Sequence, residues 1–125
     1  MKKRYLQPLL ERDLKERMVF IGGPRQVGKT TLSKQIGADM NEEYLYLNWD
    51  SREHRRQIMT GVFSAETPLI IFDEIHKYKG WKNYLKGLYD TRAGGTKLIA
   101  TGSARLDVYR RGGDSLFGRY RYYRL

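Results

Sequence analysis

The sequence contains no cysteine and only two histidines, His54 and His76, among its 125 residues. Without thiols the chain cannot form disulfides or offer thiolate ligands to a metal, and two isolated histidines do not form a histidine-rich metal site. No segment approaches the roughly 18 consecutive apolar residues of a membrane-spanning helix. The basic N-terminus is not followed by a long apolar segment, which argues against a secretory signal. These absences predict a cytoplasmic protein without a membrane partner.

The charge of the chain is strongly one-sided, with 24 basic and 14 acidic residues and a formal net charge of +10. The hydrophobic fraction of 40% is that of a globular chain, and the length predicts one domain. Such a charge attracts anions in general, including nucleotides, nucleic acids and acidic protein surfaces. Two interpretations remain open: a solvated basic surface that faces another domain, or a nucleic-acid surface.

One glycine-rich stretch carries the clearest chemistry. Residues 23–30 read G-P-R-Q-V-G-K-T and match the phosphate-loop pattern G-x-x-x-x-G-K-[ST] in full. A predicted strand over 18–21 precedes the loop, and a predicted helix over 31–36, ended by Gly37, follows it. Backbone N–H groups of such a loop and the N-terminus of such a helix bind phosphates.

The loop residues therefore predict a nucleotide site with magnesium. Lys29 would contact the outer phosphates as a compact cation, and the hydroxyl of Thr30 would coordinate magnesium. The expected nucleotide-binding residues are Gly23, Pro24, Arg25, Gln26, Val27, Gly28, Lys29, Thr30 and Thr31.

A short apolar run over 69–72 predicts a strand buried on both faces, and it ends in Asp73 and Glu74. Asp73 would hold the metal, directly or through water, and Glu74 would polarise a water molecule for attack on the terminal phosphate. Alone, such an acidic pair is as typical of a helix cap or an exposed surface as of a nucleotide site. Its position downstream of Lys29 and Thr30 favours the nucleotide site.

A further strand predicted over 44–49 lies between the loop strand and the strand that ends in Asp73. Together with Glu74, this additional strand favours the branch of P-loop proteins that uses a catalytic glutamate. No guanine-reading N-K-x-D stretch is present.

A fourth predicted strand, over 97–101, ends in Thr101, Gly102 and Ser103. In a parallel sheet this strand end lies beside the acidic pair, so Thr101 and Ser103 would hydrogen-bond the attacking water or the terminal phosphate. Ser103 also suits the N-cap of a helix predicted over 104–110, and both roles remain open. His76 is either a positioning residue or a loop residue.

The remaining segments predict packing elements. Apolar positions at helical spacing predict helices over 5–17 and 80–90. Asp50 followed by Glu53 resembles a capping box at the start of a short helix, whose arginines at 52, 55 and 56 are expected on an exposed face. The aromatic tail over 120–125 predicts a last strand, although its alternating arginines and tyrosines also resemble a nucleic-acid surface.

Four motifs in order resemble the AAA-type ATPases of the archaeal-ATPase-like family, and the resemblance covers nearly the whole chain. The motifs are the loop at 23–31, F-D-E-I-H-K at 72–77 followed by Gly80 and Trp81, T-G-S at 101–103, and S-L-F-G-R-Y at 115–120. The resemblance implies an α/β fold, a three-layer α/β/α P-loop NTPase core with a parallel sheet of strand order 5-1-4-3-2. It also implies binding and hydrolysis of ATP with Mg²⁺.

The resemblance implies partners as well. Arg119 resembles the arginine that reaches a neighbouring subunit's phosphate in AAA-type assemblies, with Arg105, Arg111 and Arg121 as competing candidates. Family members usually continue into a C-terminal lid and a winged-helix-like segment. We therefore expect residues 1–125 to form a single ATPase core domain coupled to further copies of the chain or to a missing domain. The alternative is a basic nucleic-acid-binding module with a regulatory or inert nucleotide site.

Overall fold

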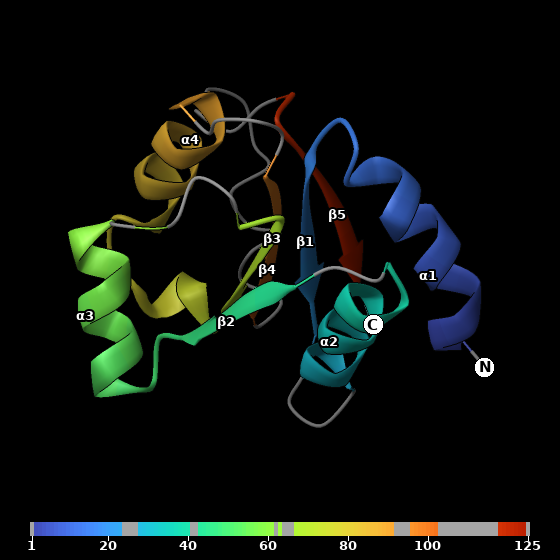
Figure 1. The fold of residues 1–125 in the computed structure, drawn as a ribbon, viewed down its shortest axis with the longest axis horizontal. Helices are drawn as coiled ribbons and strands as arrows, with labels where there is room; N and C mark the ends of the chain where they lie inside the picture. The colour runs from blue at the N-terminus through green and yellow to red at the C-terminus, as the bar shows by residue number, and fades with distance from the viewer. Residues whose placement is uncertain are drawn as a thin grey trace.

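The structure, a computed structural model, describes residues 2–23, 28–40, 43–61, 63, 67–91, 96–102 and 118–124. Five parallel strands form one sheet in the order β2-β3-β4-β1-β5 (Figure 1). Read from the opposite edge, this is the predicted order 5-1-4-3-2, so the predicted topology is confirmed. The strands are β1 (Met18–Gly22), β2 (Tyr44–Asn48), β3 (Leu69–Asp73), β4 (Lys97–Gly102) and β5 (Tyr120–Arg124).

Helices cover both faces of the sheet. Helices α1 (Lys2–Asp13) and α2 (Lys29–Asp39) lie on one side of it, and α3 (Arg52–Thr60) and α4 (Trp81–Thr91) lie on the other (Figure 1). A short 3₁₀ helix, η1 (Ile75–Lys77), follows β3. The predicted three-layer α/β/α architecture is therefore confirmed.

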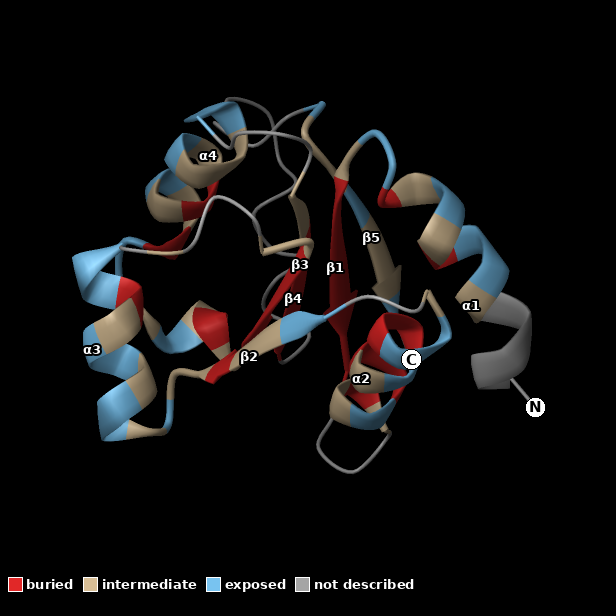
Figure 2. Cartoon of the chain, viewed as in Figure 1, coloured by how far each residue is buried: buried red, intermediate tan, exposed pale blue. Residues whose placement is uncertain are grey.

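Two apolar clusters, one on each face, hold the layers together. Neighbouring residues of β1 alternate between them: Phe20 packs with α3 and α4, and Val19 packs with α1 and α2. Strands β1 and β3 are buried along their whole length (Figure 2). Such two-sided burial explains why both strands read as continuous apolar runs.

The strand order decides what meets at the carboxyl edge of the sheet. Strand β4 lies between β1 and β3, which separates the phosphate-loop strand from the strand that ends in Asp73. In the register of these strands Asp73 pairs with Thr101 on one side and with Asn48 on the other. Residues far apart in the sequence thus meet where all five strands end, the usual position of a ligand site in a parallel sheet.

Two helices, α1 and α2, depart from their predicted bounds by two or more residues. Helix α1 covers Lys2–Asp13 instead of 5–17, with Pro8 in its interior. Helix α2 continues beyond Gly37 to Asp39. Gly37 is not a stop signal: a Cβ there would stand 2.5 Å from Cδ2 of Tyr44, so the close approach of the β2 edge explains the glycine.

The predicted capping box at Asp50 is wrong. The N-cap of α3 is Ser51, whose hydroxyl accepts a hydrogen bond from the backbone N–H of His54 at 3.3 Å. Asp50 has other partners: its N–H donates to Oδ1 of Asn48 at 2.9 Å, and its carboxylate accepts from Nζ of Lys77 at 2.9 Å. The helix predicted over 104–110 lies outside the described residues.

Candidate nucleotide site

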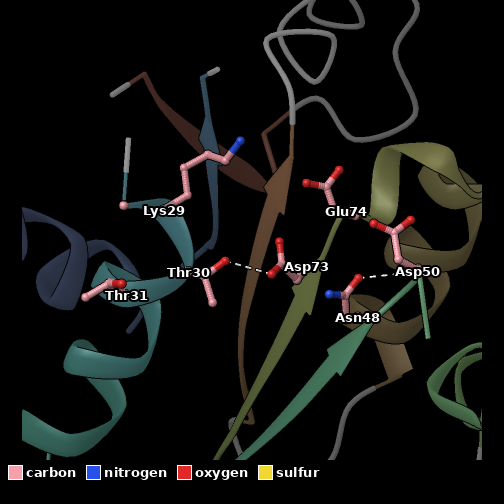
Figure 3. A pocket seen from close by; sticks show the side chains of 8 residues that line it. Lys29, Thr30, Thr31, Asn48, Asp50, Asp73 and Glu74 are labelled. Atoms are coloured by element: carbon pink, nitrogen blue, oxygen red, sulfur yellow. Dashed lines mark hydrogen bonds between the residues drawn. The ribbon is translucent and has the colours of Figure 1, made fainter. Parts of the chain in front are cut away.

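A cavity of about 470 Å³ opens at the carboxyl edge of the sheet. Figure 3 shows α2 on one side of it, the end of β3 at its centre and the end of β2 on the other side. The residues that line it are Gly28, Lys29, Thr30, Thr31, Asn48, Asp50, Asp73 and Glu74.

Lys29 is a buried cation at the start of α2. The residue is only 6% exposed, and its Nζ donates a hydrogen bond to the carbonyl oxygen of Gly23 at 2.7 Å. A buried ammonium group is costly unless it is paired with acceptors. Gly28, the N-cap of α2, has a φ of 90°, a left-handed conformation that favours glycine. The loop thus presents an ammonium group and a helix N-terminus to the cavity.

Asp73 is the most heavily hydrogen-bonded carboxylate of the site. It is only 5% exposed and accepts bonds from three hydroxyl groups. Thr30 donates to Oδ2 at 2.7 Å, Thr101 donates to Oδ1 at 2.6 Å, and Tyr46 donates to Oδ2 as well. Hydrogen bonds to an ionised acceptor are stronger than neutral ones, so this arrangement stabilises and orients a buried carboxylate.

Tyr46 connects β2 to this carboxylate. Burial, and then the hydrogen bond to Asp73, raise the pKa of the Tyr46 phenol above its usual value, so it remains a proton donor. Nδ2 of Asn48 donates to the phenol oxygen at 3.4 Å, and Nζ of Lys34 lies 4.1 Å from the ring centroid. The ring therefore joins α2, β2 and β3.

Glu74 occupies an unusual backbone position between β3 and η1. Its φ of 58° and ψ of 28° place it in the left-handed region, which among the described residues no other non-glycine residue occupies. Its Oε2 atom lies 3.7 Å from Nε2 of His76 and 3.7 Å from Nζ of Lys77. Lys77 is shared with Asp50, so the carboxylate belongs to a network at the cavity wall.

His76 also explains the glycine at the end of β4. A Cβ at Gly102 would stand 2.4 Å from Nδ1 of His76, closer than real Cβ atoms approach. The imidazole therefore lies against the β4 backbone and within reach of Glu74. This placement is consistent with a positioning role for His76.

Six of the described residues predicted for the site line the cavity: Gly28, Lys29, Thr30, Thr31, Asp73 and Glu74. Three do not. Gly23 accepts the hydrogen bond from Nζ of Lys29, and Thr101 is fully buried beside Asp73 on the neighbouring strand. Arg119 lies at the amino end of the sheet, where its Nε donates to Oδ1 of Asp90 at 2.8 Å and lowers the pKa of that carboxyl group. Pro24, Arg25, Gln26, Val27 and Ser103 lie outside the described residues.

Three residues of the β2 side were missed by the sequence analysis: Tyr46, Asn48 and Asp50. Tyr46 and Asn48 were interpreted only as part of a strand, because aromatic and apolar residues dominate the segment, and Asp50 was interpreted only as a helix cap. A parallel register would have revealed them, since it places Asn48 directly beside Asp73.

The oxygen atoms of Thr30 and Asp73 fit a magnesium ion. A hydroxyl and a carboxylate, 2.7 Å apart at the cavity, are the hard oxygen ligands that Mg²⁺ prefers. Across the described part of the chain, no group of three or more histidine and acidic side chains forms a metal site of its own. The donors suit an ion that also binds nucleotide phosphates and water.

Among the residues that the structure describes, no helix is long and apolar enough to cross a membrane.

Comparisons with solved structures show the same fold. The Holliday junction branch migration motor RuvB of Thermotoga maritima superposes with a TM-score of 0.61 at 17% identity, covering 98% of this chain and 44% of that one. Bacteroides Pif1 bound to single-stranded DNA gives a TM-score of 0.60 at 16% identity, covering 95% of this chain and 40% of that one. The chain thus spans less than half the length of these proteins. No curated protein matches its sequence.

A comparison with protein families gives the remaining evidence. The family described as "AAA domain" matches residues 15–125, which is most of the chain and includes the phosphate loop, Asp73 and Glu74. The chain therefore belongs to this AAA domain family and has the fold of a nucleotide-binding, AAA-type P-loop ATPase.

Proposed function

We propose that this chain binds ATP with Mg²⁺ and hydrolyses it. The observation that carries the proposal is the hydrogen bond of 2.7 Å between Thr30 and Asp73 at a cavity that Lys29 and Glu74 also line. Two oxygen ligands, a buried cation and a second carboxylate are the groups that phosphoryl transfer to water requires.

Each of these groups has a distinct role in the proposed reaction. Lys29 contacts the terminal phosphates, Thr30 and Asp73 hold the metal, and Glu74 accepts a proton from the attacking water. Bound Mg²⁺ supplies positive charge that offsets the charge of the phosphates. Thr101 acts through Asp73, because its hydroxyl is used on that carboxylate. His76 and Lys77 flank Glu74 and orient it.

Two substitutions in the full chain test the proposal. Lys29→Ala removes the phosphate contact and is expected to weaken ATP binding by roughly 100-fold, as measured by calorimetry in excess Mg²⁺. Glu74→Gln keeps size and polarity and is expected to preserve binding while abolishing phosphate release. Hydrolysis by Glu74→Gln at the parent rate would disprove the assignment of the base.

We further propose that hydrolysis serves an attached domain or a partner subunit, in the cytoplasm where ATP is available. The description of RuvB as a motor supports this, as does the length of the matched structures, more than twice that of this chain. In an assembly, Arg119 would be the arginine that contacts a neighbouring copy's phosphate. Because Arg119 lies at the amino end of the sheet, away from the cavity of its own chain, this role requires action in trans.

Arg119→Ala is therefore expected to bind ATP like the parent. In the parent, the rate of hydrolysis per chain should rise with protein concentration, and the variant should lose this rise. The competing candidate Arg121 is tested in parallel by Arg121→Ala, which removes an equally basic side chain two residues away. If both variants hydrolyse ATP like the parent at all concentrations, Arg119 does not act on a neighbouring copy's phosphate.

A second candidate function is binding of nucleic acid, with the nucleotide site in a regulatory role. Besides the net charge of +10, three arginines on α3 line a cavity of about 510 Å³: Arg52, Arg55 and Arg56, together with Met59 and Thr60. The solved neighbours include a protein bound to single-stranded DNA. Affinity for a single-stranded oligonucleotide should then fall steeply with salt. No binding at low salt would exclude this function.

A further inference from the structure

We propose that Tyr46 is a positioning residue that orients Asp73 so that the site distinguishes metal-bound from metal-free nucleotide. This inference rests on the proposed function of the cavity. It assigns a role in metal binding to an edge strand that carries neither the phosphate loop nor the acidic pair.

The hydrogen bonds of Asp73 carry the argument. A carboxylate offers about four acceptor positions, two on each oxygen. On Oδ2, Thr30 and Tyr46 fill both positions. On Oδ1, Thr101 fills one. A single acceptor position, on Oδ1, is thus left for a group that enters from the cavity.

Tyr46 is the donor that leaves Asp73 with its open acceptor position on Oδ1. Thr101 holds Oδ1 from the neighbouring strand β4, and Thr30 is itself an expected metal ligand. Without the phenol, Oδ2 would have an empty acceptor position, and the carboxylate could rotate about its Cβ–Cγ bond.

The phenol is held in place from several sides. Lys34 lies over the ring at 4.1 Å, and the amide of Asn48 donates to its oxygen. The rings of His54 and Tyr46 form a T-shaped pair with centroids 6.2 Å apart. Because these contacts come from α2, β2 and α3, Tyr46 is held in position before any ligand arrives, which keeps the cost of orienting Asp73 low.

The chain offers a matched control. On the opposite edge of the sheet, Tyr123 of β5 donates its phenol proton to Asp13 and packs against the same apolar cluster as Tyr46. Tyr123→Phe removes the same atom from the same kind of pair, but away from the cavity.

The experiment measures binding of a non-hydrolysable ATP analogue to the full chain by calorimetry, once in excess Mg²⁺ and once in EDTA. For Tyr46→Phe we expect affinity in Mg²⁺ to fall about tenfold and affinity in EDTA to stay within about twofold of the parent. For Tyr123→Phe we expect the parent's affinity in both conditions. A selective effect in Mg²⁺ is one that loss of folding would not produce.

Three results would overturn the proposal. Equal affinity of Tyr46→Phe and the parent in Mg²⁺ would show that the phenol does not act on the metal. An equal loss in Mg²⁺ and EDTA would show a structural role only. No binding by the parent in either condition would refute the proposed function itself, and the inference with it.

Discussion

The two edge strands of the sheet carry the same polar pair in different surroundings. On β2, Tyr46 donates to Asp73, and on β5, Tyr123 donates to Asp13. Burial and the aspartate raise the pKa of both phenols. Around Asp73, however, two threonine hydroxyls converge, whereas the further charged neighbour of Asp13 is Arg121, 55% exposed, at 3.8 Å.

This difference separates the proposed ligand site from a structural contact. The Asp13 pair joins the end of α1 to the last strand, at the edge of the sheet opposite to β2. The Asp73 pair lies where strands, a glycine-rich loop and a helix N-terminus meet. A tyrosine–aspartate hydrogen bond therefore does not identify a functional residue by itself. The additional donors and the adjoining cavity are what support the proposal for Tyr46.

The largest effect that separates the two edges is expected from Gly102→Ala, on the cavity side. The new methyl group would displace the His76 ring, 2.4 Å from its Cβ position, and through it Glu74. Overpacking of this kind costs about 1–3 kcal/mol, measured by denaturant unfolding. Phosphate release should fall more than ATP affinity. The double variant with His76→Ala should recover stability, and failure to do so would show that the clash lies elsewhere.

A smaller effect is expected from Thr101→Val, which makes the surroundings of Asp73 more like those of Asp13. The substitution keeps the shape of a fully buried side chain and removes one donor to Oδ1. We expect a loss of about 1 kcal/mol in the free energy of unfolding, since Asp73 loses one hydrogen bond while its two other hydroxyl donors remain. Unchanged stability would mean that the remaining donors satisfy Asp73 alone.

The smallest effect is expected from Tyr123→Phe, and it depends on pH. Burial and then Asp13 raise the pKa of Tyr123 to about 12 from an ordinary value near 10. A raised folded-state pKa stabilises the fold below pH ~10, and this contribution is lost as pH rises toward ~12. The variant should therefore be slightly less stable than the parent at neutral pH, with the gap closing above pH ~10. A constant gap in thermal midpoints across this range would contradict the assignment.

The sequence was most informative where one physical demand dominates. Two-sided burial produces continuous apolar runs, so the central strands could be located. The phosphate loop needs glycines and Lys29 at fixed spacing, so its pattern could be identified from the residues alone. The positions of Gly28, Lys29, Thr30, Asp73 and Glu74 around one cavity followed from a parallel sheet.

Contacts across strands could not be predicted in the same way. Tyr46 looks like an ordinary strand aromatic, and only the register of β2 against β3 brings it to Asp73. Gly37 was interpreted as a stop signal and Gly102 as part of a strand end, but each lies against a neighbouring ring that the local sequence does not reveal. The capping error at Asp50 has the same origin, since Lys77 competes for that carboxylate from another element.

The left-handed backbone of Glu74 has a consequence for engineering. For a residue with a side chain that conformation costs about 1–2 kcal/mol, whereas glycine adopts it freely. Selection of variants for heat resistance alone would therefore favour glycine at position 74 and would remove the carboxylate from the cavity. At this position thermal tolerance and turnover are opposed, so a screen for more robust variants should score phosphate release alongside melting.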